Sequence, residues 1–145
     1  MPGVVRPVID ERDGLLAYLA QQREALRIAV HGITDEQATS RPTASALSLA
    51  GLIKHAAQTE RGWMVEIVAQ RELPEPQDYE AGFRLEEGET VAGVLDLYTA
   101  VAAETESIVA EIADLGQPVP VPQGVPWFPD DVKEWSVRWV LLHLI

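Results

Sequence analysis

Residues 48–63, SLAGLIKHAAQTERGW, define the helix on which the fold and the candidate site both depend. Ser48 is placed to cap the helix, because a serine hydroxyl accepts a hydrogen bond from a backbone N–H of the first turn. Apolar residues recur at helical spacing, so we predict a helix from Ser48 to about Gln70. Its predicted apolar face consists of Leu49, Leu52, Ile53, Ala56, Trp63, Ile67 and Val68. His55 lies one turn after Leu52 on this face, so we expect it to be at least partly buried.

Three further segments have the pattern of amphipathic helices. We predict a helix over Glu11–Val30, and another over Val91–Leu115 with Thr90 as its N-cap. The spacing of Thr34–Gln37 is that of a capping box and predicts one short helical turn. A last helix is predicted to begin after Ser136, where nine residues follow in this sequence. We therefore predict an all-α fold, a four-helix bundle with long crossover connections and a short last helix.

Two connections are long for a compact domain. Residues 73–89 are rich in proline, glycine and acidic residues, which is typical of a plain surface connection or of a lid over a binding site. Residues 117–129, QPVPVPQGVPWFP, contain too many prolines for a helix or a central strand. We expect this tract to be an extended crossover along the bundle. Its aromatic pair, Trp127 and Phe128, would either pin the crossover to the bundle or line a pocket.

Length, charge and cysteine content exclude several classes of protein. A chain of 145 residues is too short for two stable cores, so we predict one domain over residues 1–145. A formal net charge of −12 disfavours contact with the phosphates of nucleic acid. Because the sequence has no run of about 18 apolar residues and no apolar signal segment, we expect a cytoplasmic protein without a membrane span. The absence of cysteine excludes disulfides, thiolate metal sites and a cysteine nucleophile.

Two of the three histidines are candidates for a metal site. His55 lies on the second long helix and His143 on the last, and both are flanked by apolar residues. Inward-facing histidines on different helices of a bundle are the usual beginning of a metal centre, although a single such histidine is more often a core residue. Imidazole suits zinc, nickel, copper or iron, but a stable site needs at least three protein ligands. His31 lies at a helix C-terminus, where its ring is favourable to the helix dipole and needs no function.

Other polar residues are given structural interpretations. Glu60 and Arg61 are neighbours on the second helix, and we predict a solvated pair there. Gly51 and Gly62 weaken this helix slightly but allow close contact with another helix. The chain has neither a P-loop nor the Gly-x-Ser-x-Gly sequence of a hydrolase nucleophile.

The segment Ser48–His55, followed by Trp63, resembles the second-helix motif of the DinB/YfiT-like metalloenzyme superfamily. In that motif a Ser or Thr caps a helix whose later histidine binds metal, with an aromatic residue two turns beyond. Residues 135–144, WSVRWVLLHL, resemble the start of the superfamily's last helix. Residues 13–42 are similar to its first helix and the turn that follows. The resemblance is to a mainly actinobacterial subgroup related to bacillithiol S-transferases and to the N-terminal domain of mycothiol-dependent maleylpyruvate isomerase.

This resemblance implies a four-helix bundle with a divalent metal near its centre. In many relatives three histidines hold the metal, one from the second helix and two from the last. The first corresponds to His55, whereas His143 lies one or two turns before the usual pair. We therefore expect the last helix to continue past Ile145 into an acidic, histidine-rich segment that carries further ligands. Relatives also form dimers through helix faces, so a homodimer is expected.

Two hypotheses for function follow. The first is an enzyme of the thiol S-transferase or isomerase type, in which a divalent metal (zinc or nickel) held by His55 and His143 activates a low-molecular-weight thiol such as mycothiol. A metal ion deprotonates a bound thiol near neutral pH, and the thiolate attacks an electrophile. This hypothesis agrees with the absence of cysteine, because the cofactor supplies the nucleophile. The alternative is a non-catalytic helical module that binds a small ligand or a partner chain.

Overall fold

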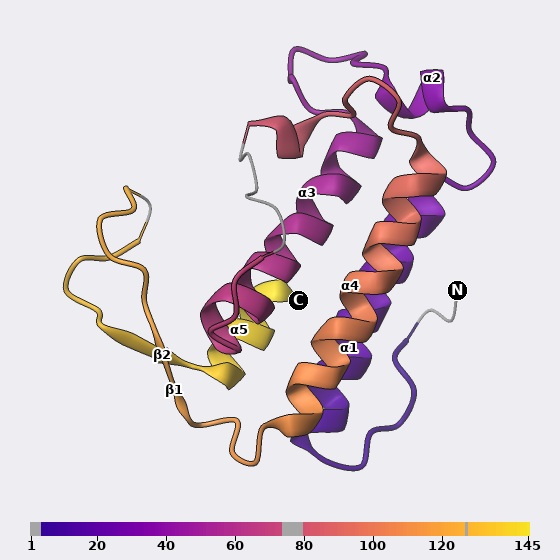
Figure 1. Ribbon diagram of the computed structural model, residues 1–145. Helices are drawn as coiled ribbons and strands as arrows, with labels where there is room; N and C mark the ends of the chain where they lie inside the picture. The colour runs from indigo at the N-terminus through magenta and orange to yellow at the C-terminus, as the bar shows by residue number, and fades with distance from the viewer. Residues whose placement is uncertain (1–3, 74–79, 127) are drawn as a thin grey trace.

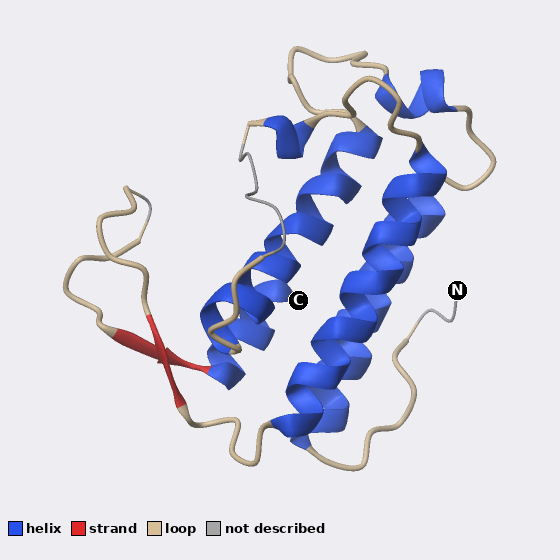
Figure 2. Ribbon diagram, in the orientation of Figure 1, coloured by secondary structure: helices blue, strands red, loops and turns tan. Residues whose placement is uncertain are grey.

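The computed structural model describes residues 4–73, 80–126 and 128–145. It is mostly helical, with four main helices packed together, as the sequence predicted (Figure 1). The helices, in chain order, are α1 (Glu11–Ala29), α2 (Asp35–Thr39), α3 (Leu49–Arg61), the π-helix η1 (Gly62–Val68), the 3₁₀ turn η2 (Ala81–Phe83), α4 (Val91–Glu111) and α5 (Val137–Leu144). Two short strands, β1 (Pro118–Pro120) and β2 (Glu134–Ser136), form an antiparallel hairpin beside the bundle (Figure 2).

The predicted helix starts are confirmed by their caps. The hydroxyls of Ser48, Thr90 and Ser136 each accept a hydrogen bond from a backbone N–H three residues later. Thr34 forms a complete capping box with Gln37, in which each side chain bonds the other residue's backbone N–H. These caps satisfy N–H groups that would otherwise lack a partner at the helix starts.

Three segments differ from the predicted secondary structure. The helix predicted over 48–70 changes from α to π geometry at Gly62. The proline tract contributes β1, in which Val119 is buried, rather than a crossover without pairing. Prolines are tolerated there because a two-stranded sheet has an open edge on each strand. Helix α4 ends at Glu111, earlier than predicted, and the Arg12 guanidinium donates hydrogen bonds to the backbone carbonyls of Val109, Ile112 and Ala113 at this end.

The core consists of two hydrophobic clusters. The first, which we call the Trp63 cluster, contains buried residues Leu15, Leu19, Trp63, Met64, Val65, Ile108, Val109, Ile112, Leu115, Val119, Val137, Val140 and Leu141. The second, the Tyr98 cluster, contains Val30, Ala38, Ala50, Ile53, Ala57, Val91, Val94 and Tyr98. Helix α5 contributes only to the first, so the two ends of the bundle are covered differently.

The predicted apolar face of the second helix is wrong at its start. Leu49 and Leu52 are 41% and 37% exposed, whereas Ala50, Ile53 and Ala57 are buried. The turn η2 lies directly on α3, where Phe83 comes against Gly51. A Cβ atom on Gly51 would lie 2.0 Å from the Phe83 carbonyl oxygen, so only glycine allows this approach. The close contact predicted at Gly51 is therefore present, but its partner is Phe83 of η2 rather than another main helix.

Candidate functional site

A cavity of about 790 Å³ runs along one face of α3 and η1. Its lining includes residues from successive turns of these two helices, starting at His55 and ending at Ile67. The proline-rich segment, β2 and α5 supply the remaining walls. The volume is within the range of pockets that bind small molecules.

His55 lies at the α3 end of this cavity and is half-buried. Its ring stacks on the Phe83 ring, with centroids 4.0 Å apart, and its Nε2 atom lies 3.4 Å from the Thr59 hydroxyl oxygen. Burial lowers the pKa of His55 below its usual 6.5, because desolvation disfavours the charged imidazolium. The ring is therefore largely neutral at pH 7. The sequence prediction that His55 is partly buried is confirmed.

His143 lines the same cavity from α5. Its ring stacks on Trp139 with centroids 5.0 Å apart and meets Trp63 edge-on at 5.2 Å. Unlike His55, it is exposed to solvent. The structure thus brings to one cavity the two histidines that the sequence singled out.

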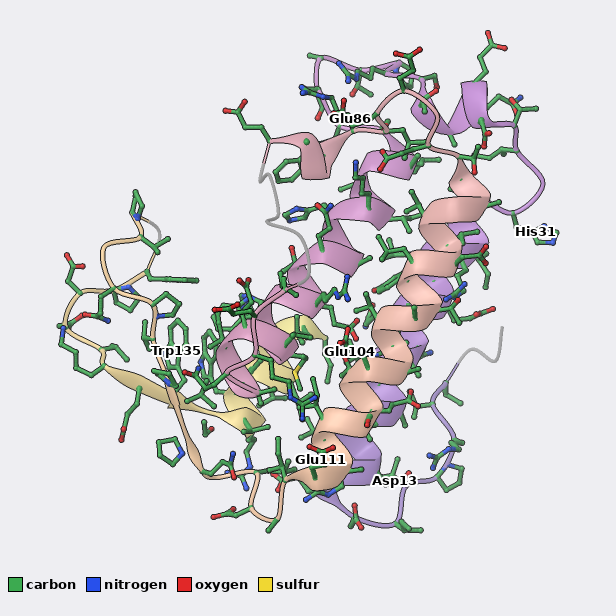
Figure 3. All side chains as sticks on the ribbon, in the orientation of Figure 1. Asp13, His31, Glu86, Glu104, Glu111 and Trp135 are labelled. Atoms are coloured by element: carbon green, nitrogen blue, oxygen red, sulfur yellow. The ribbon has the colours of Figure 1, made fainter. Side chains whose placement is uncertain are left out.

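Aromatic rings form the other part of the cavity lining. Trp63 is buried, and its ring contacts Phe128, Trp135 and Trp139 with centroid distances of 5.4 to 5.8 Å. Trp135 projects from β2 toward this group (Figure 3). Phe128 both lines the cavity and packs on the core, so the two roles considered for it are combined. Trp127, its neighbour in the sequence, lies outside the described residues.

The residues present do not complete a metal site. Among the side chains that the structure describes, no three from His, Cys, Asp and Glu are grouped so that they could hold a metal ion. Glu66 also lines the cavity, but it does not form such a group with His55 and His143. His31 is exposed at the end of α1 and is not part of the cavity (Figure 3). Two imidazoles alone fall short of the three protein ligands that a stable site requires.

The prediction for Glu60 and Arg61 is wrong. Glu60 is only 2% exposed. The Arg23 guanidinium of α1 donates two hydrogen bonds to the Glu60 carboxylate, from Nη2 to Oε1 at 2.5 Å and from Nε to Oε2 at 3.1 Å. The Thr105 hydroxyl of α4 donates a third hydrogen bond to Oε1, at 2.6 Å. Arg61 instead pairs with Glu104 on α4. A buried carboxylate needs such partners, and here they come from helices distant in sequence.

The sequence contained one overlooked signal for this buried ionic cluster of Arg23, Glu60 and Thr105. Arg23 lies four residues after Leu19 and three before Leu26, on the apolar stripe of the first helix. A charged residue in that register either turns away or finds a buried partner. The partner could not be identified from sequence, because it requires the relative positions of α1 and α3.

The segment predicted as a surface connection or a lid is tied to α3 in its described part. The Lys54 ammonium group is buried and donates hydrogen bonds to the Arg84 carbonyl oxygen at 3.1 Å and to the Glu89 carboxylate at 2.7 Å. This ion pair and a further hydrogen bond lower the pKa of Glu89, against an opposing effect of desolvation. Residues 74–79 lie outside the described residues, so the lid interpretation stays a prediction.

Comparison with protein families identifies the chain. Residues 14–145 match the family model described as mycothiol-S-transferase, which covers nearly the whole sequence. The chain belongs to the mycothiol-S-transferase family. This is a DinB/YfiT-like family related to mycothiol-dependent enzymes, so the resemblance found in the sequence is confirmed.

Membership in the mycothiol-S-transferase family implies a mycothiol-dependent S-transferase, with the small thiol mycothiol as a substrate. No curated protein matched the sequence. Within the described residues, no helix combines the length and the apolar character that crossing a membrane requires.

Proposed function

We propose that the chain joins mycothiol, through its thiol sulfur, to an electrophile inside the cavity lined by His55 and His143. The observation that carries this proposal is that the two histidines line a single cavity, with aromatic walls beside them. The matched family supports the thiol and the reaction type.

His55 has the protonation state that this reaction needs. A thiol attacks as its thiolate, so a group must take up its proton or otherwise stabilise the negative sulfur. Because burial keeps the His55 ring neutral at pH 7, it can accept a proton or bind a metal ion. The chain itself has no cysteine, so the attacking sulfur must come from the thiol substrate.

The proposal includes a divalent metal, zinc or nickel, with His55 and His143 as two of its ligands. If bound there, such an ion would supply a Lewis acid that lowers the pKa of a thiol ligand. The described residues supply no complete set of three protein ligands. The metal is therefore a separate part of the proposal and is tested by itself.

A steady-state assay with mycothiol and 2-chloroacetamide, corrected for the uncatalysed rate, tests the transferase proposal. We expect His55→Ala to lower kcat/KM by about 100-fold, the size expected when a positioned proton acceptor is removed. His31→Ala is the matched control, because His31 is exposed and lies outside the cavity. Absence of catalysed transfer in the wild type, or unchanged transfer in His55→Ala, would contradict the proposal.

Elemental analysis of the same preparations tests the metal. We expect zinc or nickel in the wild-type protein, loss of transfer after chelation, and recovery when the metal is returned. His55→Ala and His143→Ala should each lower the metal content. Full activity in metal-free protein would overturn this part alone.

The incomplete ligand set favours one alternative, a non-catalytic module that binds a small ligand or a partner chain. The expected homodimer is compatible with both the transferase and the non-catalytic module. Light scattering on the purified chain tests for it directly. Binding of mycothiol without any transfer would support the module over the enzyme.

A further inference from the structure

The aromatic walls of the cavity form an ordered stack. Trp135, Trp139 and His143 make a column of nearly parallel rings, with interplanar angles of 10° and 11° and centroid distances of 3.9 and 5.0 Å. Trp63 packs against the side of all three rings, at angles of 47° to 66°. Trp139, the middle ring, has Trp135 stacked on one face and His143 on the other, so it offers its edge to the cavity. An edge-on contact is one of the arrangements that a flat ring entering the cavity would prefer.

The column remains accessible. Trp139, its middle ring, is 36% exposed, although the ring is large and apolar. His143 is exposed at one end of the column, and both residues line the cavity. Exposed aromatic surface inside a cavity is typical of a ligand site rather than of core packing.

Apart from the proposed metal ion, the charges around the cavity disfavour anions. None of the described residues that line it is lysine or arginine. The Glu66 carboxylate lines it, and the whole chain carries a formal net charge of −12. A carboxylate or phosphate on the electrophile would enter this aromatic part of the cavity without a cationic side chain to pair with it.

We infer that the electrophile is an uncharged molecule with a flat aromatic or conjugated group, which packs on the column of Trp135, Trp139 and His143. This inference rests on the proposed function and specifies its second substrate. In the transfer, the thiol sulfur forms a bond to the electrophilic carbon and the leaving group departs with its electron pair. The thiol proton passes to His55 and from there to solvent.

A matched series of chloroacetamides tests the inference with one reactive group. The three compounds are 2-chloro-N-phenylacetamide, its non-planar N-cyclohexyl analogue, and the N-(4-carboxyphenyl) analogue, which adds a negative charge. In each, the sulfur displaces chloride from the same carbon. We expect kcat/KM for the phenyl compound to exceed that for the cyclohexyl compound about five- to tenfold, the range expected of one aromatic contact. The carboxylated compound should be slower than the phenyl compound by at least a similar factor.

Two substitutions locate the effect on the column. Trp139→Leu should remove most of the preference for the phenyl compound, whereas Trp139→Phe should retain it because a flat ring remains. Leu142→Ala is the matched control on the same helix, since Leu142 is 58% exposed and outside the cavity. Circular dichroism on each variant checks that the fold is intact. Equal rates for the phenyl and cyclohexyl compounds, or a preference that survives Trp139→Leu in folded protein, would overturn the inference.

Binding without chemistry separates this inference from the proposed function. Acetanilide and N-cyclohexylacetamide resemble the phenyl and cyclohexyl substrates in shape but have no leaving group. Chemical-shift titration measures their affinities. Tighter binding of acetanilide that depends on Trp139, in a protein without transfer activity, would support the aromatic subsite and refute the transferase. Transfer activity in a protein that does not bind acetanilide more tightly would support the transferase and refute the aromatic subsite.

Discussion

Two groups of polar residues inside this bundle differ in how they are partnered. In the buried ionic cluster, Arg23 of α1 and Thr105 of α4 each donate hydrogen bonds to the Glu60 carboxylate of α3. In the cavity, the His55 and His143 rings pack mainly on aromatic neighbours, and the His55 Nε2 atom lies 3.4 Å from the Thr59 hydroxyl oxygen. The first arrangement holds helices in register, whereas the second leaves surface for a ligand. In this bundle the fully buried polar side chains therefore have a structural role, and the partly exposed histidines belong to the candidate site.

The largest effect is expected from Glu60→Ala, which leaves the Arg23 guanidinium buried without its main partner. Removing one side of a buried ion pair costs about 3–5 kcal/mol of unfolding free energy. Urea denaturation measures the loss. Glu104→Ala is the control, because its pair with Arg61 is partly exposed and is expected to contribute at most about 1 kcal/mol. Equal losses in the two variants would show that the buried ionic cluster does not stabilise the bundle more than a surface pair does.

A smaller loss is expected from Gly51→Ala. The new methyl group would overlap the Phe83 carbonyl oxygen, so the segment carrying Phe83 must move off α3. Such overpacking costs about 1–3 kcal/mol. Because the Phe83 ring stacks on His55, the His55 ring signals in an NMR spectrum should shift as well.

Gly93→Ala is the matched control for that substitution. Gly93 is also in a helix, but the nearest side-chain atom to its added Cβ lies at an ordinary contact distance of 3.4 Å. The substitution should stabilise α4 by about 0.5–1 kcal/mol, because alanine is the better helix former. A destabilised Gly93→Ala variant would mean that helix propensity does not govern this position.

Replacing His55 should separate stability from function. His55→Ala is expected to change the unfolding free energy by less than about 1 kcal/mol, since the ring is half-buried and removal creates no enclosed void. The same variant is expected to lose transfer activity. A loss as large as that of Glu60→Ala would place His55 among the structural residues and contradict the division between the two groups.

The smallest effect is expected at an exposed ion pair, Arg6 with Asp13, which has the same 2.5 Å separation as Arg23 with Glu60. The hydrogen bonds from Arg6 and from the Ile9 backbone N–H lower the pKa of Asp13 from 3.8 to about 2. At a pH between these two values the unfolded chain therefore binds more protons than the folded chain. This contribution to stability is present above pH 4 and is lost as the pH falls toward 2. An NMR titration should show the Asp13 pKa rising toward 3.8 in Arg6→Ala. An unchanged pKa would show that Arg6 is not its cause.

The sequence predicted the features that depend on local chemistry. Ser48, Thr90 and Ser136 were recognisable as caps because an N-cap bonds only its own first turn. Helical spacing likewise placed His55 on a half-buried face. The features that were missed all join distant segments. Glu60 finds Arg23 and Thr105 on other helices, Gly51 meets Phe83 across a loop, and β1 pairs with β2. The aromatic column joins residues four apart in the chain, Trp135, Trp139 and His143, so helical spacing could have indicated it, whereas its contact with Trp63 of η1 joins distant segments.

The packing of helix α5 indicates that this helix can detach from the bundle by itself. Its buried residues Val137, Val140 and Leu141 all belong to the Trp63 cluster, and none belongs to the Tyr98 cluster. Detachment of α5 therefore opens one end of the core while the other end keeps its contacts, so it requires less free energy than global unfolding. Amide protons of α5 should exchange with solvent deuterium before those around Ile53 and Val94. Because α5 also carries Trp139 and His143, its exchange rate measures how often the cavity itself opens.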